Sequence, residues 1–154
     1  MIAYFFDSSA SVKRFAKESG SNWILGLLRP SAQNWIYVSS LSLVEVTAAI
    51  ARRRKGKTLD INKANKSIKR FQRSFEKRFL IVEVTPQLLD KAAEIADRYE
   101  LRGYDAVQLA SALQANQNRQ SLGMSSIIFV SGDKELNSAA LAENLVVENP
   151  NNYP

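Results

Sequence analysis

Five short apolar segments are distributed along the chain, and longer segments with helical periodicity separate them. The apolar segments are residues 2–6, 35–39, 80–84, 126–130 and 145–148. Their apolar residues are continuous rather than alternating with polar ones, which is typical of strands buried on both faces. Strands that alternate with helices form parallel sheets, because each parallel pair needs a crossover connection. The sequence therefore predicts an α/β fold with a central parallel sheet flanked by helices.

The intervening segments have apolar residues at every third or fourth position, which predicts helices. One helix start is marked by Thr85 and Pro86, because threonine is a common N-cap and proline is favoured in the first turn. The expected helices are residues 8–18, 22–28, 41–55, 61–79, 86–101, 104–116 and 134–144. The tail 149–154 is expected to lie on the surface. A length of 154 residues predicts a single domain, residues 1–154.

Neither cysteine nor histidine occurs in the chain. Their absence excludes disulfides, Cys/His zinc sites, cysteine nucleophiles, Ser-His-Asp triads and histidine acid–base chemistry. Any catalysis must use carboxylates, hydroxyls, amides, Lys or Arg side chains, or a bound cation. The longest uncharged stretch has 15 residues, 30–44, whereas a membrane-spanning helix needs about 20 apolar residues. We therefore expect a soluble, cytoplasmic protein with no membrane partner.

The net charge of +6 is concentrated in one segment. Residues 52–78 contain twelve Lys or Arg and two acids, so this segment carries +10 and the rest of the chain carries −4. Such an asymmetry favours a polyanionic partner, with nucleic acid as the first candidate, although a solvated helical face would explain it equally well. The candidates for this contact are Arg52, Arg53, Arg54 and Lys55.

The same basic segment contains an amphipathic helix. Its apolar residues recur at helical spacing, and Asp60 or Thr58 is a plausible N-cap. The apolar positions are Ile61, Ala64, Ile68, Phe71, Phe75 and Phe79. Most stripes of this kind pack on their own domain, and a protein partner is the less common alternative.

Four acids, which we call the acidic quartet, stand apart from the other charges. They are Asp7, Glu45, Asp105 and Asp133. Asp7 and Asp133 follow predicted strands, at the end where open parallel sheets place their sites. Glu45 lies in the first turns of the helix after the second strand, and Asp105 opens the helix after Gly103. The quartet is therefore expected to meet at one edge of the sheet.

Each acid also has a purely structural interpretation. Asp7 and Asp133 could be helix N-caps, Ser42 and Glu45 have capping-box spacing, and Asp105 could stabilise a helix N-terminus through the dipole. Capping does not explain why all four acids lack a counter-charge. Carboxylates that share a site repel one another unless a cation holds them ionised, and oxygen ligands without His or Cys suit Mg²⁺ or Mn²⁺. Such a metal site beside the basic segment 52–78 suggests a metal-dependent phosphodiesterase.

These residues resemble a known family. The matching segments are residues 4–10 (YFFDSSA), 42–46 (SLVEV), 101–113 (LRGYDAVQLASAL) and 130–133 (VSGD). In this order they are similar to the motifs of the PIN domain, and most closely to the VapC-type toxins of toxin–antitoxin pairs. The resemblance implies a PIN-like three-layer fold with a helical projection around residues 60–79. It also implies an Mg²⁺- or Mn²⁺-dependent endoribonuclease that leaves 3′-hydroxyl and 5′-phosphate ends.

The resemblance assigns roles by motif position. Asp7 and Asp105 would be the main metal ligands, Glu45 and Asp133 would complete the quartet, and Ser8 and Ser131 would orient ligands or water. It also implies a homodimer and a cognate antitoxin whose C-terminal segment fills the groove. The basic segment would then hold RNA, receive an acidic antitoxin segment, or do both in turn. One departure from the family pattern is Ser11, where an aliphatic residue is more common.

Other interpretations remain open beside the toxin. A DNA-cutting or RNA-processing PIN nuclease has the same acids. A non-catalytic RNA- or antitoxin-binding module would be expected to lack one of the acids, and none is missing. A phosphoacceptor signalling domain would have a pair of adjacent acids after the first strand, where Asp7 is single. Three aromatic residues, Trp35, Tyr37 and Tyr104, are candidates for base stacking, although such residues are more often part of a core.

Overall fold

Five parallel strands form one sheet in the order β3-β2-β1-β4-β5. The computed structural model describes residues Met1–Pro154. The strands are β1 (Ala3–Phe6), β2 (Trp35–Ser39), β3 (Leu80–Val82), β4 (Ile128–Val130) and β5 (Val146–Glu148). Each strand lies within a predicted apolar segment, and all neighbouring pairs are parallel, so the predicted sheet is confirmed.

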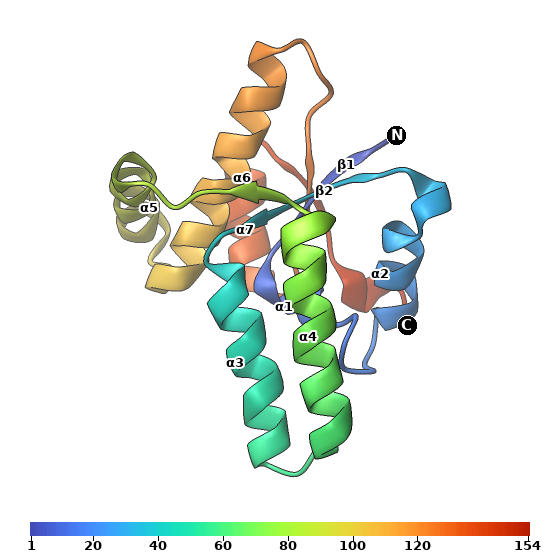
Figure 1. Ribbon diagram of the computed structural model, residues 1–154. Coiled ribbons are helices and arrows are strands. Elements are labelled where there is room, and N and C mark those ends of the chain that lie inside the picture. The colour runs from blue at the N-terminus through green and yellow to red at the C-terminus, as the bar shows by residue number, and fades with distance from the viewer.

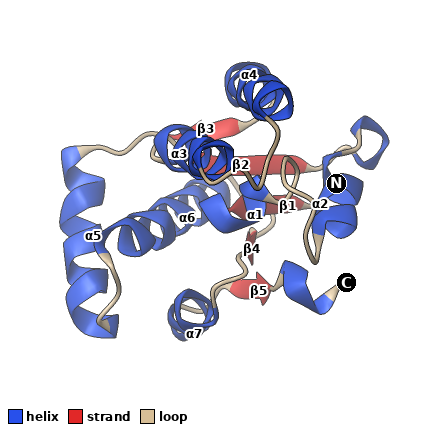
Figure 2. Cartoon of the chain, turned by 90° about the horizontal axis from the view of Figure 1, so that it is seen from below, coloured by secondary structure: helices blue, strands red, loops and turns tan.

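Helices cover both faces of this sheet. They are α1 (Ser8–Val12), α2 (Ser21–Leu28), α3 (Ser42–Lys55), α4 (Ile61–Lys77), α5 (Pro86–Tyr99), α6 (Gly103–Ser121) and α7 (Lys134–Ala142), with 3-10 turns at Pro30–Ala32 and Pro150–Asn152. Figure 2 shows α3 and α4 on one side of the sheet and α6 and α7 on the other. The predicted three-layer arrangement is therefore confirmed. None of the helices combines the length and apolar character that crossing a membrane requires.

The central strand β1 explains why both faces need a cover. Its side chains alternate between the two faces, so Phe5 joins the core under α5–α7, and Phe6 joins the core under α1–α4. Both rings are fully buried. Phe5 stacks on Phe129 of β4, with the ring centroids 5.9 Å apart. A strand that is apolar in every position thus requires helices on both sides, as the continuous apolar run predicted.

Helices α3 and α4 form a hairpin that extends away from the sheet, as Figure 1 shows. Asp60 caps α4 by accepting hydrogen bonds from the amides of Asn62 and Lys63, which confirms one of the two predicted caps. The apolar stripe of α4 packs on the rest of the domain, because Phe71 is fully buried and lies edge-on to Phe15 at 5.8 Å. The stripe therefore packs on the core except at Ile61, which is exposed, and the helical projection predicted around residues 60–79 is present.

The helix predicted over residues 8–18 is wrong in its second half. Helix α1 ends at Val12, and the backbone then turns so that the Lys13 side chain points inward. Its ammonium group donates to Glu18 Oε1 at 3.1 Å, to the Ser19 carbonyl at 2.8 Å and to Asn151 Oδ1 at 2.9 Å. A continuing helix could not bring Glu18 and Ser19 back onto this ammonium group, so the buried lysine accounts for the early helix end.

The C-terminal tail and α6 also differ from the prediction. The sequence predicts a tail on the surface, but Pro150 is buried and Tyr153 stacks on Trp23 with ring centroids 4.5 Å apart. Helix α6 begins at Gly103 rather than after it and continues to Ser121, five residues beyond the predicted end. Its extra turn is held by the buried Arg119, whose guanidinium donates to the Ser125 carbonyl at 2.7 Å.

The buried hydroxyl of Ser11 leads to a stability prediction. Ser11 is on the core side of α1, and its Oγ has no hydrogen-bond partner. Because an unsatisfied buried hydroxyl is unfavourable, we expect Ser11→Ala to raise the free energy of unfolding by about 1 kcal/mol in urea denaturation.

Ser21→Ala is the matched control for this substitution. Ser21 is equally buried, but its hydroxyl donates to the Ala16 carbonyl and accepts from the Glu18 amide. We expect this variant to lose about 1 kcal/mol. A loss of stability in both variants would contradict the assignment of Ser11 as an unsatisfied group.

Candidate active site

The acidic quartet lies where the strand order of the sheet reverses. Strands β2 and β3 lie on one side of β1, and β4 and β5 lie on the other, so β1 and β4 are neighbours at the reversal point. The amide of Asp7 donates to the Val130 carbonyl at 3.1 Å, which continues the pairing beyond the strand ends. Ligand sites of open parallel sheets occur at this point of the carboxyl edge.

Asp7 is the buried centre of the site, with only 4% of its surface exposed. Its Oδ2 accepts from the Ser131 hydroxyl at 2.6 Å, and its Oδ1 accepts from the Ser9 hydroxyl at 2.7 Å and the Ala10 amide at 2.9 Å. Burial raises the pKa of Asp7 to about 6, and these three hydrogen bonds oppose the rise. Asp7 is therefore the N-cap of α1, which confirms the predicted capping role. It also accepts a hydrogen bond from Ser131, which directly follows β4.

Glu45 is held by side chains from two other helices. Its Oε1 accepts from the Ser8 hydroxyl of α1 at 2.7 Å and from Nε2 of Gln108 in α6 at 2.8 Å. The capping-box interpretation of Ser42 and Glu45 is wrong, because α3 has no side-chain cap. The buried Ser42 hydroxyl instead lies 3.1 Å from the Gln108 amide nitrogen.

Asp105 and Asp133 complete the quartet from α6 and α7. Asp105 is in the first turn of α6, and Asp133 caps α7 by accepting from the Leu136 amide at 2.9 Å. The pKa of Asp105 is raised to about 6, first by burial and then by the charges of Asp133, Asp7 and Glu45, whereas Arg102 lowers it. Asp105 thus lies within reach of the charges of the other three carboxylates, at the edge of the sheet where the quartet was expected to meet.

Sequence reasoning missed Gln108, which links the elements of the site. Its side chain is 2% exposed, and its Nε2 is within 3.1 Å of the Ser8 and Ser42 hydroxyls as well as of Glu45. Its Oε1 is buried without a hydrogen-bond partner. The available signal was a polar residue three positions after Asp105 in an otherwise apolar stretch of helix.

The donor chemistry of the quartet fits a hard divalent cation. The candidate ligands are carboxylate and hydroxyl oxygens, and a bound cation would remove the repulsion by the neighbouring acids that adds to the raised pKa of Asp105. The geometry is open, because no three acidic side chains come close enough to surround one ion. Protein ligands would therefore be few, and waters would complete the coordination, which is usual for Mg²⁺.

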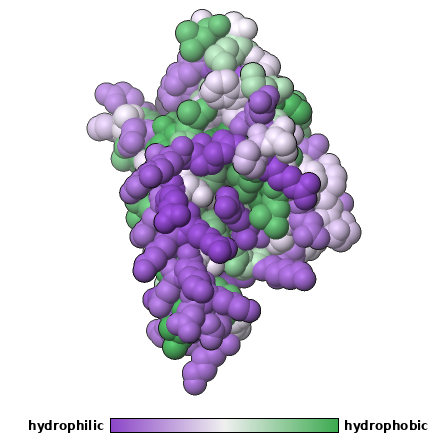
Figure 3. Space-filling model, turned by 45° about the vertical axis from the view of Figure 1, so that its right-hand side comes forward, coloured by the Kyte–Doolittle hydropathy of each residue, from purple (hydrophilic) through white to green (hydrophobic).

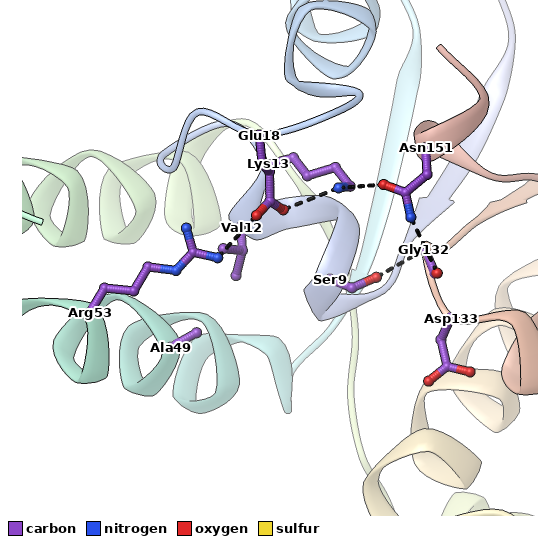
Figure 4. Close-up of a pocket in the computed structure, with 9 residues that line it drawn as sticks. All are labelled: Ser9, Val12, Lys13, Glu18, Ala49, Arg53, Gly132, Asp133 and Asn151. Carbon is purple, nitrogen blue, oxygen red and sulfur yellow. Dashed lines mark hydrogen bonds and ion pairs between the residues drawn. The ribbon is translucent and has the colours of Figure 1, made fainter. Parts of the chain in front are cut away.

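The predicted basic contacts are not all free to bind a ligand. The guanidinium group of Arg53 pairs with Glu18 at 3.1 Å, and Arg54 donates to Asn65 at 2.6 Å, whereas Arg52 and Lys55 are exposed. Arg53 and Glu18 line a pocket of about 390 Å³ that reaches Asp133, drawn in Figure 4. This pocket connects the acidic edge with the side of α3 that carries Arg53.

Of the three candidate aromatic residues, one lies beside the quartet. Tyr104 is exposed next to Asp105, and its hydroxyl accepts from Arg102 at 3.1 Å. Trp35 begins β2, at the opposite end of the strand from the carboxyl edge. Tyr37 packs against the core under α5–α7 and its hydroxyl accepts from Arg119.

Solved structures share this fold at low sequence identity. VapBC2 from Rickettsia felis, bound to a DNA fragment from its promoter, is 18% identical (TM-score 0.64), and the match covers 96% of this chain and 98% of that one. FitAcB from Neisseria gonorrhoeae is 18% identical (TM-score 0.61; 97% and 98% covered). VapC20 from Mycobacterium tuberculosis, a toxin that cleaves the sarcin–ricin loop, is 15% identical (TM-score 0.60; 88% and 94% covered).

No curated protein matches the sequence. A family model, however, matches residues 4–141, a range that contains the five-residue helix α1, the projecting hairpin and the whole acidic quartet. The match agrees with the motifs noted in the sequence and with the sheet order of the structure. The chain therefore belongs to the PIN domain family.

Proposed function

We propose that the chain is a metal-dependent endoribonuclease that hydrolyses RNA phosphodiester bonds, with the acidic quartet as its catalytic carboxylates. PIN domains are a family of nucleases, and membership of this family supports a hydrolase activity for the chain. The observation that carries the proposal is that four carboxylates share one edge of the sheet, where burial and neighbouring acids raise the pKa of Asp7 and of Asp105 to about 6. Such an arrangement is unfavourable for folding and is useful for holding a cation beside a phosphate.

In this proposal Asp7 and Asp105 hold a divalent ion, Mg²⁺ or Mn²⁺. PIN nucleases generally use such ions. Bound there, the ion would lower the pKa of a water and neutralise developing phosphate charge. The Ser131 hydroxyl fixes Asp7 through its bond to Oδ2, and the Ser8 hydroxyl fixes Glu45. These donors limit the rotation of both carboxylates, so their oxygens point to a constant position.

We further propose that the chain is the toxin of a toxin–antitoxin pair and forms a homodimer. The solved structures of similar fold include a VapBC pair, FitAcB and a toxin–antitoxin complex from Klebsiella pneumoniae. An antitoxin would bind this chain and block RNA access. A DNA-cutting nuclease and a non-catalytic binding module are the alternatives that the first experiment separates.

The first experiment compares cleavage by the wild type and by variants of the quartet. A pool of structured and unstructured RNAs, and a matched DNA pool, are incubated with Mn²⁺, with Mg²⁺ or with EDTA. We expect metal-dependent RNA cleavage that falls at least about 100-fold in Asp7→Asn and Asp105→Asn, because each removes a charged metal ligand. Asp60→Asn is the control, since Asp60 caps the projecting helix α4 and asparagine caps equally well.

Three outcomes would contradict the proposal. Cleavage that survives in both variants would assign the activity to another site or to a contaminant. Cleavage confined to DNA would support the alternative nuclease. An absence of both cleavage and Mn²⁺ binding by calorimetry would support the binding module.

The raised pKa values predict how pH affects the metal-free protein. The pKa of Asp7 is about 6 in the folded protein, against 3.8 for an unperturbed aspartate such as that of the unfolded chain, so the folded state retains the proton between these values. The stability from this proton is present at low pH and is lost as the pH rises through 6. In EDTA we expect Asp7 to contribute about 1 kcal/mol less stability at pH 8 than at pH 5, and Asp7→Asn should remove this contribution while that of Asp105 remains.

Divalent ions should reverse this trend, because they bind the ionised carboxylates. We expect Mn²⁺ affinity, measured by calorimetry, to increase between pH 5 and pH 7 with release of protons. A pH-independent affinity would show that the quartet carboxylates are not the ligands.

Gln108 is expected to be a positioning residue for Glu45. Gln108→Leu keeps the volume of the buried side chain but removes the amide that donates to Glu45, so we expect kcat to fall about tenfold at unchanged KM. Gln114→Leu on the exposed side of α6 is the matched control. A shared loss of kcat in both variants would assign the effect to α6 stability.

A further inference from the structure

A hollow of about 520 Å³ lies between α4 and the segment that follows α1, outside the acidic quartet. Four cations line it: Arg14, Lys63, Lys66 and Arg70. No acidic residue lines it, so we call it the cationic hollow. Figure 3 shows hydrophilic side chains over the projecting hairpin at the bottom of the view and a hydrophobic patch beside them.

The charges in the cationic hollow have no partner within the chain. The four ion pairs of the structure use Lys13, Arg53, Lys91 and Arg98 as their basic members, and none uses a cation of the hollow. Burial lowers the pKa of Arg14, and the charges of Arg70 and Arg78 lower it further. Lys63, Lys66 and Arg70 are exposed around the half-buried Arg14, and an anion in the hollow would offset the repulsion among these like charges.

The arrangement of the hollow matches a nucleic-acid strand. Lys63, Lys66 and Arg70 follow one another at helical spacing, so they form a row of cations along one side of α4. The Phe15 ring lies in the same hollow with the Arg14 guanidinium 5.5 Å from its centroid. A row of cations with an aromatic ring is the combination that binds the phosphates and the bases of single strands.

The hollow also lies close to the acidic quartet along the chain. Helix α1 begins directly after Asp7, and Arg14 and Phe15 in the turn that follows it line the hollow. Ser9, Val12 and Lys13 of the same segment line the pocket of Figure 4, which reaches Asp133. An RNA strand held in the hollow would therefore lie beside the segment that leads to the carboxylates.

We propose that the cationic hollow binds the phosphodiester backbone of the RNA substrate, with Phe15 against a base. This rests on the proposed function and moves the RNA contact away from Arg53 and Arg54, whose guanidinium groups already have partners. The chemical class is a single-stranded polyanion with aromatic bases. An acidic protein segment would satisfy the cations but would offer no base to the half-buried Phe15 ring.

The experiment measures RNA binding apart from cleavage. Fluorescence anisotropy of a labelled oligouridylate is recorded in EDTA with the full chain carrying Asp7→Asn, so that the strand stays intact. The test variant adds Lys66→Glu with Arg70→Glu. The control adds Lys69→Glu with Arg73→Glu, which makes the same charge change on the same helix outside the hollow.

We expect the test variant to bind about tenfold more weakly and the control to change about twofold at most. The slope of log affinity against log salt should fall by about 1.4 in the test variant, because each phosphate contact on a single strand contributes about 0.7. Equal losses in the two variants would overturn the proposal in favour of a diffuse field, and no loss in either would overturn it outright. Polyglutamate that binds as tightly as RNA, with the same sensitivity to the substitutions, would assign the hollow to an acidic protein segment instead.

The outcomes are separable from those of the cleavage experiment. RNA binding that depends on the hollow in a protein that cleaves nothing would support the hollow and contradict the nuclease. Cleavage that requires the quartet, with binding indifferent to Lys66 and Arg70, would support the nuclease and contradict the hollow.

Discussion

The hydrogen bond from the Ser131 hydroxyl to Asp7 is the interaction on which the site depends. It joins the end of β4 to the end of β1, 124 positions apart in the chain. A carboxylate as buried as that of Asp7 is tolerated only when several donors compensate it, and here the donors come from β4, from α1 and from the backbone. The pairing of β1 with β4 therefore supports both the sheet and the chemistry, because a shift in register would leave this acid without the Ser131 donor.

Acidic and basic side chains form two separate clusters on either side of the segment that follows Asp7. The acidic quartet gathers at the start of α1, and the unpaired cations gather beyond its end at Arg14 and along α4. Between them, Glu18 neutralises Lys13 and Arg53. The chain therefore uses its ion pairs to hold the connecting segment in place, and leaves unpaired those charges that a cation and a polyanion would satisfy. Folding alone does not favour such a distribution, which is typical of a binding surface.

Much of this organisation could be predicted from local sequence. The strands, the N-caps at Asp60 and Thr85 and the convergence of the quartet all follow from patterns within a few residues. The failures have a common cause. The end of α1 depends on Lys13 reaching Asn151, the position of the tail depends on Trp23 meeting Tyr153, and the capping box was displaced by Gln108. Each is a contact between residues far apart in the sequence, which periodicity and cap rules do not contain.

The sequence by itself determined the alternation of strands and helices, the absence of Cys and His chemistry, and the family, because these depend on residue type and short spacings. The tertiary structure alone decided which charges remain available. Arg53 and Arg54 looked as free as Lys66 and Arg70 in the sequence, and folding gave partners to the first two and left the others around a hollow. The physical reason is that an ion pair or a hydrogen bond requires two groups within about 4 Å, and only the packing of the segment after α1 and of α3 and α4 sets those distances.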